Sequence, residues 1–330
     1  MKLKWISEHK AFSLTAANLI LILLLFFTKD PFSLFSRTYD RAENFFKISE
    51  KDVQKIRLAK PDFPDYEKEI SRDGMNWELK VKSGKKFRAD SEKTETLLKS
   101  LLGAKKFTVI TSSKEKGAEF GVTGGEAIEA ELFDKAGSLG KITVGTAGGG
   151  GSFTHIKWNG GDEIYLVEDN LKAAAGRGAD DFFFDKKISP SGLTSSDIIT
   201  VSLKDSSALK RDFEVQKAEK DWTAVKPATG PISSEEISSL LSRLSSLSAD
   251  EVISDEKKIP ELDKKDSVEI RFSFKKGAES GSVVLNVLGK DTKGNHYYAV
   301  KNNEPTVYRM SEYSLKQILE FKPGAKPAKQ

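Results

Sequence analysis

Two hydrophobic patterns occur along this chain, and they recur in the same order in its two halves. Strict alternation of apolar and polar residues, as in Trp77-Glu78-Leu79-Lys80-Val81 and Val268-Glu269-Ile270-Arg271-Phe272, predicts strands with one buried face. Apolar residues three and four apart, as in Leu240, Leu241 and Leu244, predict a helix that covers a sheet with one face. For each half the pattern therefore predicts several strands, then one helix, then further strands.

The strands predicted for the first half are Val53–Leu58, a hairpin strand ending near Arg72, Trp77–Val81, Ala127–Phe133, Gly140–Gly145, Phe153–Trp158 and Glu163–Val167. Those of the second half are Ile198–Leu203, a hairpin strand ending near Lys217, a strand from Trp222, Ser267–Phe274, Ser282–Leu288, His296–Val300 and Thr306–Met310. Asp90 is placed to cap the first helix, and Ser233 with Glu236 has the spacing of a capping box for the second. Each half is thus predicted to be an α+β unit of about six strands in an antiparallel sheet with one main helix.

Individual residues also return at a nearly constant spacing. The matched pairs include Trp77 with Trp222, Leu97-Leu98 with Leu240-Leu241, Gly145 with Gly289, and Ile164-Tyr165 with Val307-Tyr308, all offset by 143 to 145 residues. An offset this long and this constant predicts two tandem copies of one domain. We expect lobe 1 over residues 48–190 and lobe 2 over residues 194–322, joined through Leu171–Gly192, which we expect to be partly helical.

The N-terminus contains a membrane-anchor pattern. Ala11–Phe27 has no charged residue, and seventeen helical residues span about 26 Å, close to the hydrocarbon thickness of a bilayer. Lysines 2, 4 and 10 precede it, so the positive-inside rule places residues 1–10 in the cytoplasm and the lobes outside. We expect a transmembrane anchor over residues 11–28 and a juxtamembrane linker over residues 29–47. A cleaved signal peptide is the alternative, although no small-residue cleavage site follows Phe27.

Composition narrows the function classes. A chain of 330 residues accommodates two domains, and 53 basic against 49 acidic residues give no basic footprint of a nucleic-acid binder. The chain has no cysteine, which excludes disulfides, thiolate metal sites and a cysteine nucleophile. The Pro- and Lys-rich residues 323–330 are expected to form a disordered tail.

Candidate chemistry is sparse, and each pattern has a structural interpretation. His155 and His296 fall in strands of different lobes, and neither belongs to a metal-binding array. Gly148–Gly151 lacks the following Lys-Ser or Lys-Thr of a phosphate loop and precedes a strand, so we expect a hairpin loop. Acidic pairs such as Asp180-Asp181 lack a calcium-loop spacing. We therefore assign no catalytic, cofactor-binding or metal-binding residue.

Two further patterns leave alternatives open. The basic run Lys80, Lys82, Lys85, Lys86 and Arg88 contains a turn at Lys82–Lys85, so it is either a solvated loop or a contact with anionic lipid or envelope polymer. Trp77, Trp158 and Trp222 would suit a sugar-stacking platform, but the repeat relation of Trp77 and Trp222 favours core packing.

A set of motifs resembles a known family. They are Ile70-x-Arg72 leading to Trp77, Ala89-Asp90 before Leu97-Leu98-x-x-Leu101, Phe120-Gly121-Val122, Ile142-Thr143-Val144-Gly145, Ile164-Tyr165-Leu166 and Phe184-Asp185-Lys186-Lys187-Ile188. This combination resembles the bacterial domain of unknown function 4340 family, closely over residues 48–190 and loosely over 196–320. The second copy departs from the pattern, because Glu261-Leu262-Asp263 replaces Phe-Gly-Val and Arg309 stands in the place of Leu166.

The resemblance implies an N-terminally anchored extracytoplasmic protein. Such proteins are often encoded beside ABC-type export permeases and auxiliary subunits of the gliding-motility type, and the family has no established catalytic residues. We therefore expect a non-catalytic accessory protein of the cytoplasmic membrane whose partners are permease or auxiliary subunits. The alternative is an envelope polysaccharide- or peptide-binding protein, or a hydrolase, with a site between the lobes.

Overall fold

The computed structural model describes residues 18–21, 42–106, 108–206, 209–219 and 221–324. The predicted anchor Ala11–Phe27 lies outside these ranges except for residues 18–21, which are helical. Among the described helices none is long and apolar enough to span a bilayer. The predicted tail also falls outside the described part of the chain, apart from Pro323 and Gly324.

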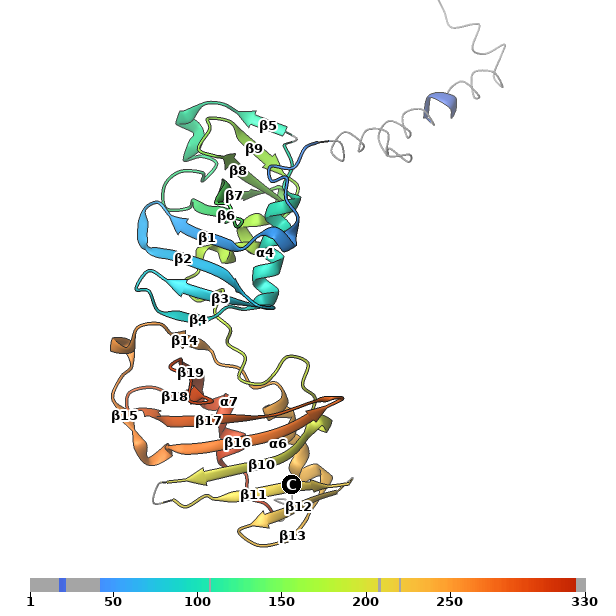
Figure 1. Cartoon of the computed structure of the whole chain (residues 1–330), viewed down its shortest axis with the longest axis vertical. Helices are drawn as coiled ribbons and strands as arrows, with labels where there is room; N and C mark the ends of the chain where they lie inside the picture. The colour runs from blue at the N-terminus through green and yellow to red at the C-terminus, as the bar shows by residue number, and fades with distance from the viewer. Residues whose placement is uncertain (1–17, 22–41, 107, 207–208, 220, 325–330) are drawn as a thin grey trace, which may run out of the picture. The chain divides into compact units, whose positions relative to one another are not determined.

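The first sheet is antiparallel and has nine strands in the order β4-β3-β2-β1-β6-β7-β8-β9-β5 (Figure 1). Its strands are β1 Lys55–Lys60, β2 Phe63–Asp73, β3 Asn76–Val81, β4 Lys86–Arg88, β5 Thr108–Thr111, β6 Ile128–Phe133, β7 Ser138–Gly148, β8 Phe153–Trp158 and β9 Ile164–Val167. The main helix is α4, Ser91–Gly103, and Leu97, Leu98 and Leu101 on its apolar stripe are fully buried. A short helix, α5 (Leu171–Ala174), confirms the helical content expected in the joining segment.

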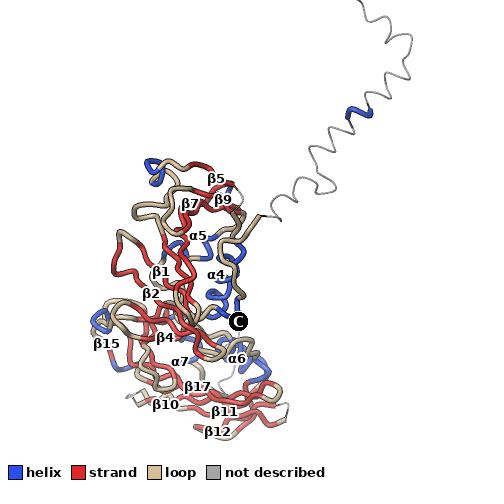
Figure 2. The backbone as a smooth tube through the Cα atoms, turned by 45° about the horizontal axis from the view of Figure 1, so that its top comes forward, coloured by secondary structure: helices blue, strands red, loops and turns tan. Residues whose placement is uncertain are grey.

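The second sheet has ten strands, and nine of them follow the same path as the first: β13-β12-β11-β10-β16-β17-β18-β19-β14. Its strands are β10 Ile198–Asp205, β11 Phe213–Ala218, β12 Asp221–Lys226, β13 Gly230–Ile232, β14 Glu251–Ile253, β15 Leu262–Asp263, β16 Val268–Lys276, β17 Glu279–Asp291, β18 His296–Lys301 and β19 Val307–Ser311. Its helices are α6 (Ser234–Ser245) and α7 (Glu312–Leu319), and β15 pairs with β17 off the path. Figure 2 shows how far strands predominate over helices. Two antiparallel sheets with one shared strand order confirm the α+β class and fit a repeat.

Matched residues occupy matched places in the two sheets. Trp77 pairs with Arg72 across the β2–β3 hairpin, and Trp222 pairs with Lys217 across the β11–β12 hairpin. Both indoles are buried. In α6 the capping box of Ser233 and Glu236 forms as predicted. Leu240, Leu241 and Leu244 of α6 are buried, as Leu97, Leu98 and Leu101 of α4 are, so each helix buries its predicted apolar stripe.

Two matched glycines, Gly145 and Gly289, show what the Phe120-Gly121-Val122 motif does in the first sheet and what replaces it in the second. A Cβ atom at Gly145 would lie 2.2 Å from the Phe120 carbonyl oxygen, and one at Gly289 would lie 2.6 Å from the Asp263 carbonyl oxygen. Each glycine thus lets a crossing segment approach the sheet more closely than a side chain would allow. The Phe-Gly-Val element and its replacement Glu261-Leu262-Asp263 consequently fill one structural role with unlike side chains.

The short edge strands were missed by the prediction from the sequence. β4, β5, β13 and β14 have three or four residues each and lie at or near the ends of the sheets. Strands this short cannot show a clear alternation, and an edge strand needs only one paired side. The helix α7 was also missed, because its apolar positions follow β19 without a break.

The chain forms two compact units whose boundaries differ from those of the two sheets. One unit comprises Met1–Val53, Lys60–Asp62 and Leu97–Ala175, and the other comprises Gln54–Ala59, Phe63–Thr96 and Gly176–Gln330. The first unit therefore contains β5–β9, and the second contains β1–β4 with the whole second sheet. The lobe boundaries 48–190 and 194–322 stay predictions.

Candidate functional site

The segment that carries the Phe184-Asp185-Lys186-Lys187-Ile188 motif is paired on both of its ends. On one side Asp90 donates its backbone N–H to the Phe183 carbonyl, and Asp185 donates to the Arg88 carbonyl. On the other side Ile188 donates to the Leu247 carbonyl at 3.0 Å. The motif thus joins the end of β4 to the chain that follows α6, and its first role is to hold these segments together.

Residues 43–46, the first strap, and residues 186–189, the second strap, are equivalent. Phe45 donates to the Ala104 carbonyl as Ile188 donates to that of Leu247. Lys106 donates to the Glu43 carbonyl as Ala249 donates to that of Lys186. Every one of these positions is offset by 143 residues, so the matched hydrogen bonds reach back to residue 43, within the predicted linker 29–47.

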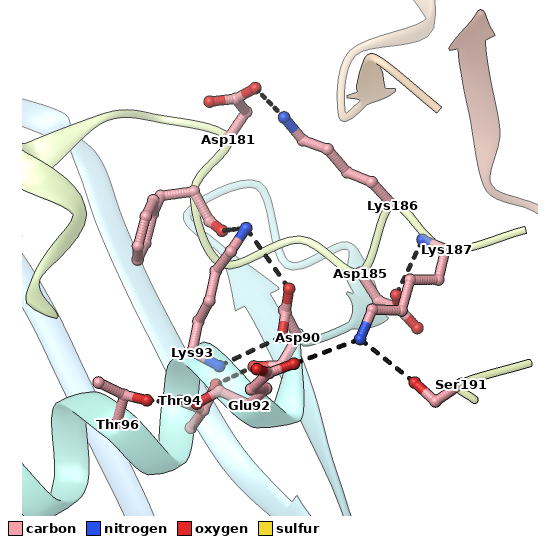
Figure 3. A network of polar contacts seen from close by, with 11 residues as sticks. Asp90, Glu92, Lys93, Thr94, Thr96, Asp181, Asp185, Lys186, Lys187 and Ser191 are labelled. Carbon is pink, nitrogen blue, oxygen red and sulfur yellow. Dashed lines mark hydrogen bonds and ion pairs between the residues drawn. The ribbon is translucent and has the colours of Figure 1, made fainter. Parts of the chain in front are cut away.

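A polar network surrounds the start of α4 (Figure 3). The Asp90 carboxylate accepts the backbone N–H of Lys93 at 3.2 Å, which confirms the predicted cap. The Lys93 ammonium donates to the Phe182 carbonyl at 3.0 Å and lies 3.4 Å from the Asp90 carboxylate. Lys187 lies 3.6 Å from Glu92 and donates to the Ser191 hydroxyl at 3.2 Å. These side chains fasten the joining segment to the helix.

Asp181 and Lys186 form an ion pair within the same network. Burial favours the neutral carboxyl, but the hydrogen bond and positive charge of Lys186 outweigh it and lower the pKa of Asp181. Asp181 is therefore ionised at neutral pH and engaged in the pair. An ionised, engaged carboxylate suits a structural contact better than proton transfer.

A buried lysine lies next to the second strap. Lys301 is 7% exposed, and its ammonium donates to the Lys187 carbonyl at 3.2 Å. Burial and the charge of Arg88 lower the pKa of Lys301, whereas Asp185 and Glu304 oppose this change. Burial raises the pKa of the nearby Tyr308 to about 12, helped by Glu304 and Asp185. In this cluster the hydrogen bond of the Lys301 ammonium goes to a backbone carbonyl.

The two histidines in the described part of the chain make ordinary strand contacts. His155 Nδ1 lies 3.1 Å from the Thr146 carbonyl oxygen and 3.2 Å from the Thr146 hydroxyl, and its ring packs on Phe120 at 4.7 Å between centroids. It pairs with Leu166, whereas Tyr298 pairs with Arg309 in the second sheet. By these pairings His155 and Tyr298 occupy matched positions in the two sheets. His296 is half-buried in β18 and pairs with Ser311.

The other sequence patterns resolve into structural features. Gly148 ends β7 and Gly149–Gly151 form a turn before β8, as expected for a hairpin loop. Trp77 and Trp222 are buried, so they do not form a stacking platform, and half-buried Trp158 packs on Phe45 and Phe46. Within the described ranges no group of three or more His, Asp or Glu side chains could hold a metal ion.

The basic run is largely neutralised. Its lysines each meet a carboxylate: Lys80 with Glu69 at 4.0 Å, Lys82 with Asp65 at 3.0 Å, Lys85 with Glu256 at 2.8 Å and Lys86 with Glu78 at 2.8 Å. Lys82 and Ser83 form the predicted turn. Exposed pairs of this kind contribute about 0–1 kcal/mol each, so they add little to the stability of the fold.

Sequence reasoning missed one surface. Val109 and Ile110 are exposed on the edge strand β5, whereas the apolar residues of the matched strand β14 are buried. The strand was not predicted, so its exposure had no counterpart in the pattern. The only usable sign was the uncharged run Thr108–Thr111 among lysines.

Comparison with known proteins gives one family. The family described as "Domain of unknown function (DUF4340)" matches residues 77–265, more than half of the chain and parts of both sheets. No curated protein and no solved structure matches. The motifs described above lie largely inside the matched span, so the chain belongs to this family, the domain of unknown function DUF4340.

Proposed function

We propose that this protein works by binding rather than by catalysis, as a membrane-anchored extracytoplasmic accessory subunit. The observation that carries the proposal is the use of the charged side chains that the fold gathers around the joining segment. Asp90 caps α4, Asp181 is paired with Lys186, and Lys93 and Lys301 donate to backbone carbonyls. Groups committed in this way hold the chain together and are poorly placed to act on a substrate.

The two sheets are, in this proposal, tandem copies of one unit. Support comes from the shared strand order, the equivalent tryptophans and glycines, and the two straps with matching hydrogen bonds. The family match begins at Trp77 and ends at Lys265, across the junction. The region matched by the family therefore includes the segment between the two sheets. This agrees with the hydrogen bonds that the Phe184–Ile188 motif makes within the fold.

The anchor is Ala11–Phe27, with the N-terminus in the cytoplasm and both sheets in the periplasmic or extracytoplasmic space. Its support is the uncharged apolar run and the lysines that precede it. The proposed partners are permease or auxiliary subunits of an ABC-type envelope export assembly, as the family resemblance implies. Near-balanced charge gives no reason to invoke nucleic acid, and we propose no cofactor.

Two measurements test this function. Cross-linking in intact membranes followed by affinity purification should recover a permease or ATPase; recovery of neither removes the transporter assignment. A hydrolase screen of the purified protein should show no turnover. Turnover abolished by one conservative carboxylate or histidine substitution would establish an enzyme instead.

Topology is tested separately. Alkaline phosphatase fused after Lys322 should be active, and the mature protein should retain its N-terminal residues. An inactive fusion, or a mature N-terminus beyond Phe27, would contradict the anchor.

A further inference from the structure

The outer edge of β4 in the first sheet, residues 87–90, holds an extended segment of the chain. The Asp90 N–H donates to the Phe183 carbonyl at 2.8 Å. The Asp185 N–H donates to the Arg88 carbonyl at 3.0 Å, and an antiparallel bridge lies between these two bonds. The segment therefore extends the first sheet by a short added strand. We call residues 87–90 the β4 edge.

Side chains reinforce this pairing. The Phe87 ring of β4 packs edge-on against Phe184 at 5.1 Å between centroids. The Lys93 ammonium donates to the Phe182 carbonyl at 3.0 Å. Phe184 is 3% exposed, so its ring is almost fully withdrawn from solvent. The β4 edge thus binds the segment through backbone, ring and ammonium contacts.

The matching edge of the second sheet is formed by β13 and the start of α6, residues 230–233, which we call the β13 edge. Pro231 lies opposite Thr223 in the place of Arg88. Ser233 caps α6 in the place of Asp90. Within the described part of the chain, β13 ends its sheet, and no bridge joins its outer side to another segment. The two edges therefore differ in occupancy at matched positions.

The first difference is a proline at a position whose backbone faces outward. Ala89 donates its N–H inward to the Trp77 carbonyl. Backbone groups of neighbouring residues in a strand point to opposite sides, so those of Arg88 point outward, where its carbonyl accepts from Asp185. Pro231 has no N–H at this position, and its ring projects to the side on which an added strand would lie. Proline is one of the residues with which proteins keep an edge strand unpaired.

The second difference is that the N–H at the helix cap is already bonded. In the second sheet the Ser233 N–H donates to the Glu236 carboxylate at 3.0 Å. The position of Glu236 is taken in α4 by Lys93, which leaves the Asp90 N–H to the added segment and donates to the Phe182 carbonyl. A carboxylate in place of this ammonium would repel the carbonyl oxygens of a segment at the β13 edge. One reversal of charge thus removes a donor and adds an obstacle.

The third difference is the loss of a ring. Gly230 lies opposite Ala224, as Phe87 lies opposite Leu79. A Cβ atom at Gly230 would meet nothing within 4 Å, so no close approach of the backbone requires a glycine here. The substitution leaves a segment at this edge without the aromatic contact that Phe87 makes with Phe184. Each feature that holds the segment at the β4 edge is therefore missing or reversed at the β13 edge.

The contact at the β4 edge is heterologous, because the edge of one unit binds chain that leads into the next unit. Contacts of this kind can continue without limit, and repeat proteins end them with terminal units whose outer face is altered. We propose that the β13 edge is a terminated form of the β4 edge, in which Pro231 and Glu236 exclude a further aromatic extended segment, such as residues 182–185 of a second copy of this chain. The protein thereby limits its own array to two sheets. This termination rests on the proposed tandem relation of the sheets and is independent of the partner protein.

Binding of the segment as a free peptide gives a direct test. A fluorescent peptide with the sequence of residues 180–187 is titrated with the purified full-length protein, and fluorescence anisotropy measures binding. Pro231→Ala with Glu236→Lys restores the outward N–H and frees the cap N–H, so this variant should bind the peptide about tenfold more tightly than the unchanged protein. Glu235→Lys is the matched control, since it makes the same charge change and keeps the proline and the capping box. It should bind no better than the unchanged protein.

The reverse exchange tests the same groups in the first sheet. Arg88→Pro with Lys93→Glu brings the blocking residues to the β4 edge and should release residues 182–185. The rate of chymotrypsin cleavage after these phenylalanines should rise about tenfold, with the far-UV circular dichroism unchanged. Arg88→Ala with Lys99→Glu is the control, because it makes the same charge change and keeps the outward N–H and the Lys93 ammonium.

Three results would overturn the proposal. They are equal peptide binding by the opened variant and its Glu235→Lys control, saturable binding by the unchanged protein with the affinity of the opened variant, and equal cleavage of the blocked variant and its control. If the opened variant does not fold, the cleavage experiment decides alone. Recovery of a permease by cross-linking is unaffected by any of these results, so a failure here leaves the proposed partner in place.

Discussion

The two straps enter their sheets with the same backbone hydrogen bonds and with different side chains. The first brings Phe45 and Phe46, which pack on Trp158, and the second brings Ile188 and Ser189. Ile188 is fully buried, and the Ser189 hydroxyl donates to the Leu244 carbonyl. The backbone contacts of the two straps are thus the same, whereas their side chains differ.

This difference separates what the shared strand order requires from what can vary between the two sheets. Backbone hydrogen bonds and close approaches to glycine depend little on neighbouring side chains, so equivalent positions retain them. Side chains that no backbone contact constrains can differ in exposure, as Val109 of β5 (47% exposed) and Val252 of β14 (4% exposed) do. Perturbing matched positions in pairs therefore tests the comparison.

The largest expected effect comes from the straps. Phe45→Ala removes a buried ring that contacts Trp158 and Tyr165, and should lower the free energy of unfolding by roughly 3–5 kcal/mol. Ile188→Ala should cost roughly 2–5 kcal/mol for a similar reason. Urea denaturation followed by fluorescence measures both, with the 94% exposed Met75→Ala as control. If Phe45→Ala leaves the free energy of unfolding almost unchanged, residues 43–46 are a linker and not part of the folded sheet.

The paired glycines should show the next largest effect. Alanine at Gly145 or Gly289 places a Cβ atom within 2.6 Å of a backbone carbonyl oxygen, so each should destabilise the protein by roughly 1–3 kcal/mol. Gly230→Ala, where a Cβ meets nothing within 4 Å, is the control and should change little. If one paired glycine tolerates alanine as Gly230 does, the crossing segments are not equivalent.

Much of this fold could be predicted from the sequence because its longer strands and its main helices have strong periodic patterns. The tryptophan pair and the glycine pair were visible as matched letters at a constant offset. The straps were not, since their equivalence lies in backbone hydrogen bonds between Phe45 or Ile188 and chain after the helix. Because these bonds join backbone atoms, the identity of the side chains does not predict them.

The candidate site was harder to predict for a different reason. The Phe184–Ile188 motif was recognised as a family feature, but its pairing with residues 88–90 and 247–249 depends on contacts far apart in sequence. The exposed fraction of Val109 depends on how distant parts of the chain fold around β5. Neither property is contained in the local pattern of β5.

Helix caps provide a smaller test. Asp90→Ala and Ser233→Ala each remove an oxygen that accepts a backbone N–H at the start of α4 or α6. Each should lower the free energy of unfolding by about 1 kcal/mol. Asp90→Ala should cost more, because Asp90 also meets Lys93 at 3.4 Å. Equal losses, measured by urea denaturation, would mean that this ion pair adds nothing to the cap.

The smallest effect concerns the matched tyrosines. The pKa values of Tyr165 and Tyr308 are both raised to about 12, the first chiefly by a hydrogen bond to Glu163 and the second chiefly by burial. Glu163→Gln should therefore lower the pKa of Tyr165, whereas Glu304→Gln should move that of Tyr308 much less. Tyrosinate absorbance, assigned with Tyr165→Phe and Tyr308→Phe, follows both groups.

The same shift at Tyr308 sets the sign of a pH dependence. A folded-state pKa above the unfolded value of about 10 contributes stability that is fully present below pH 10. That contribution is lost as pH rises from about 10 towards 12, since the unfolded chain releases its proton first. Tyr308→Phe should flatten the stability profile in this range, and Tyr165→Phe should flatten it less, because Tyr165 is more exposed. A steeper profile for Tyr308→Phe than for the unchanged protein would show that burial is not the cause at this position.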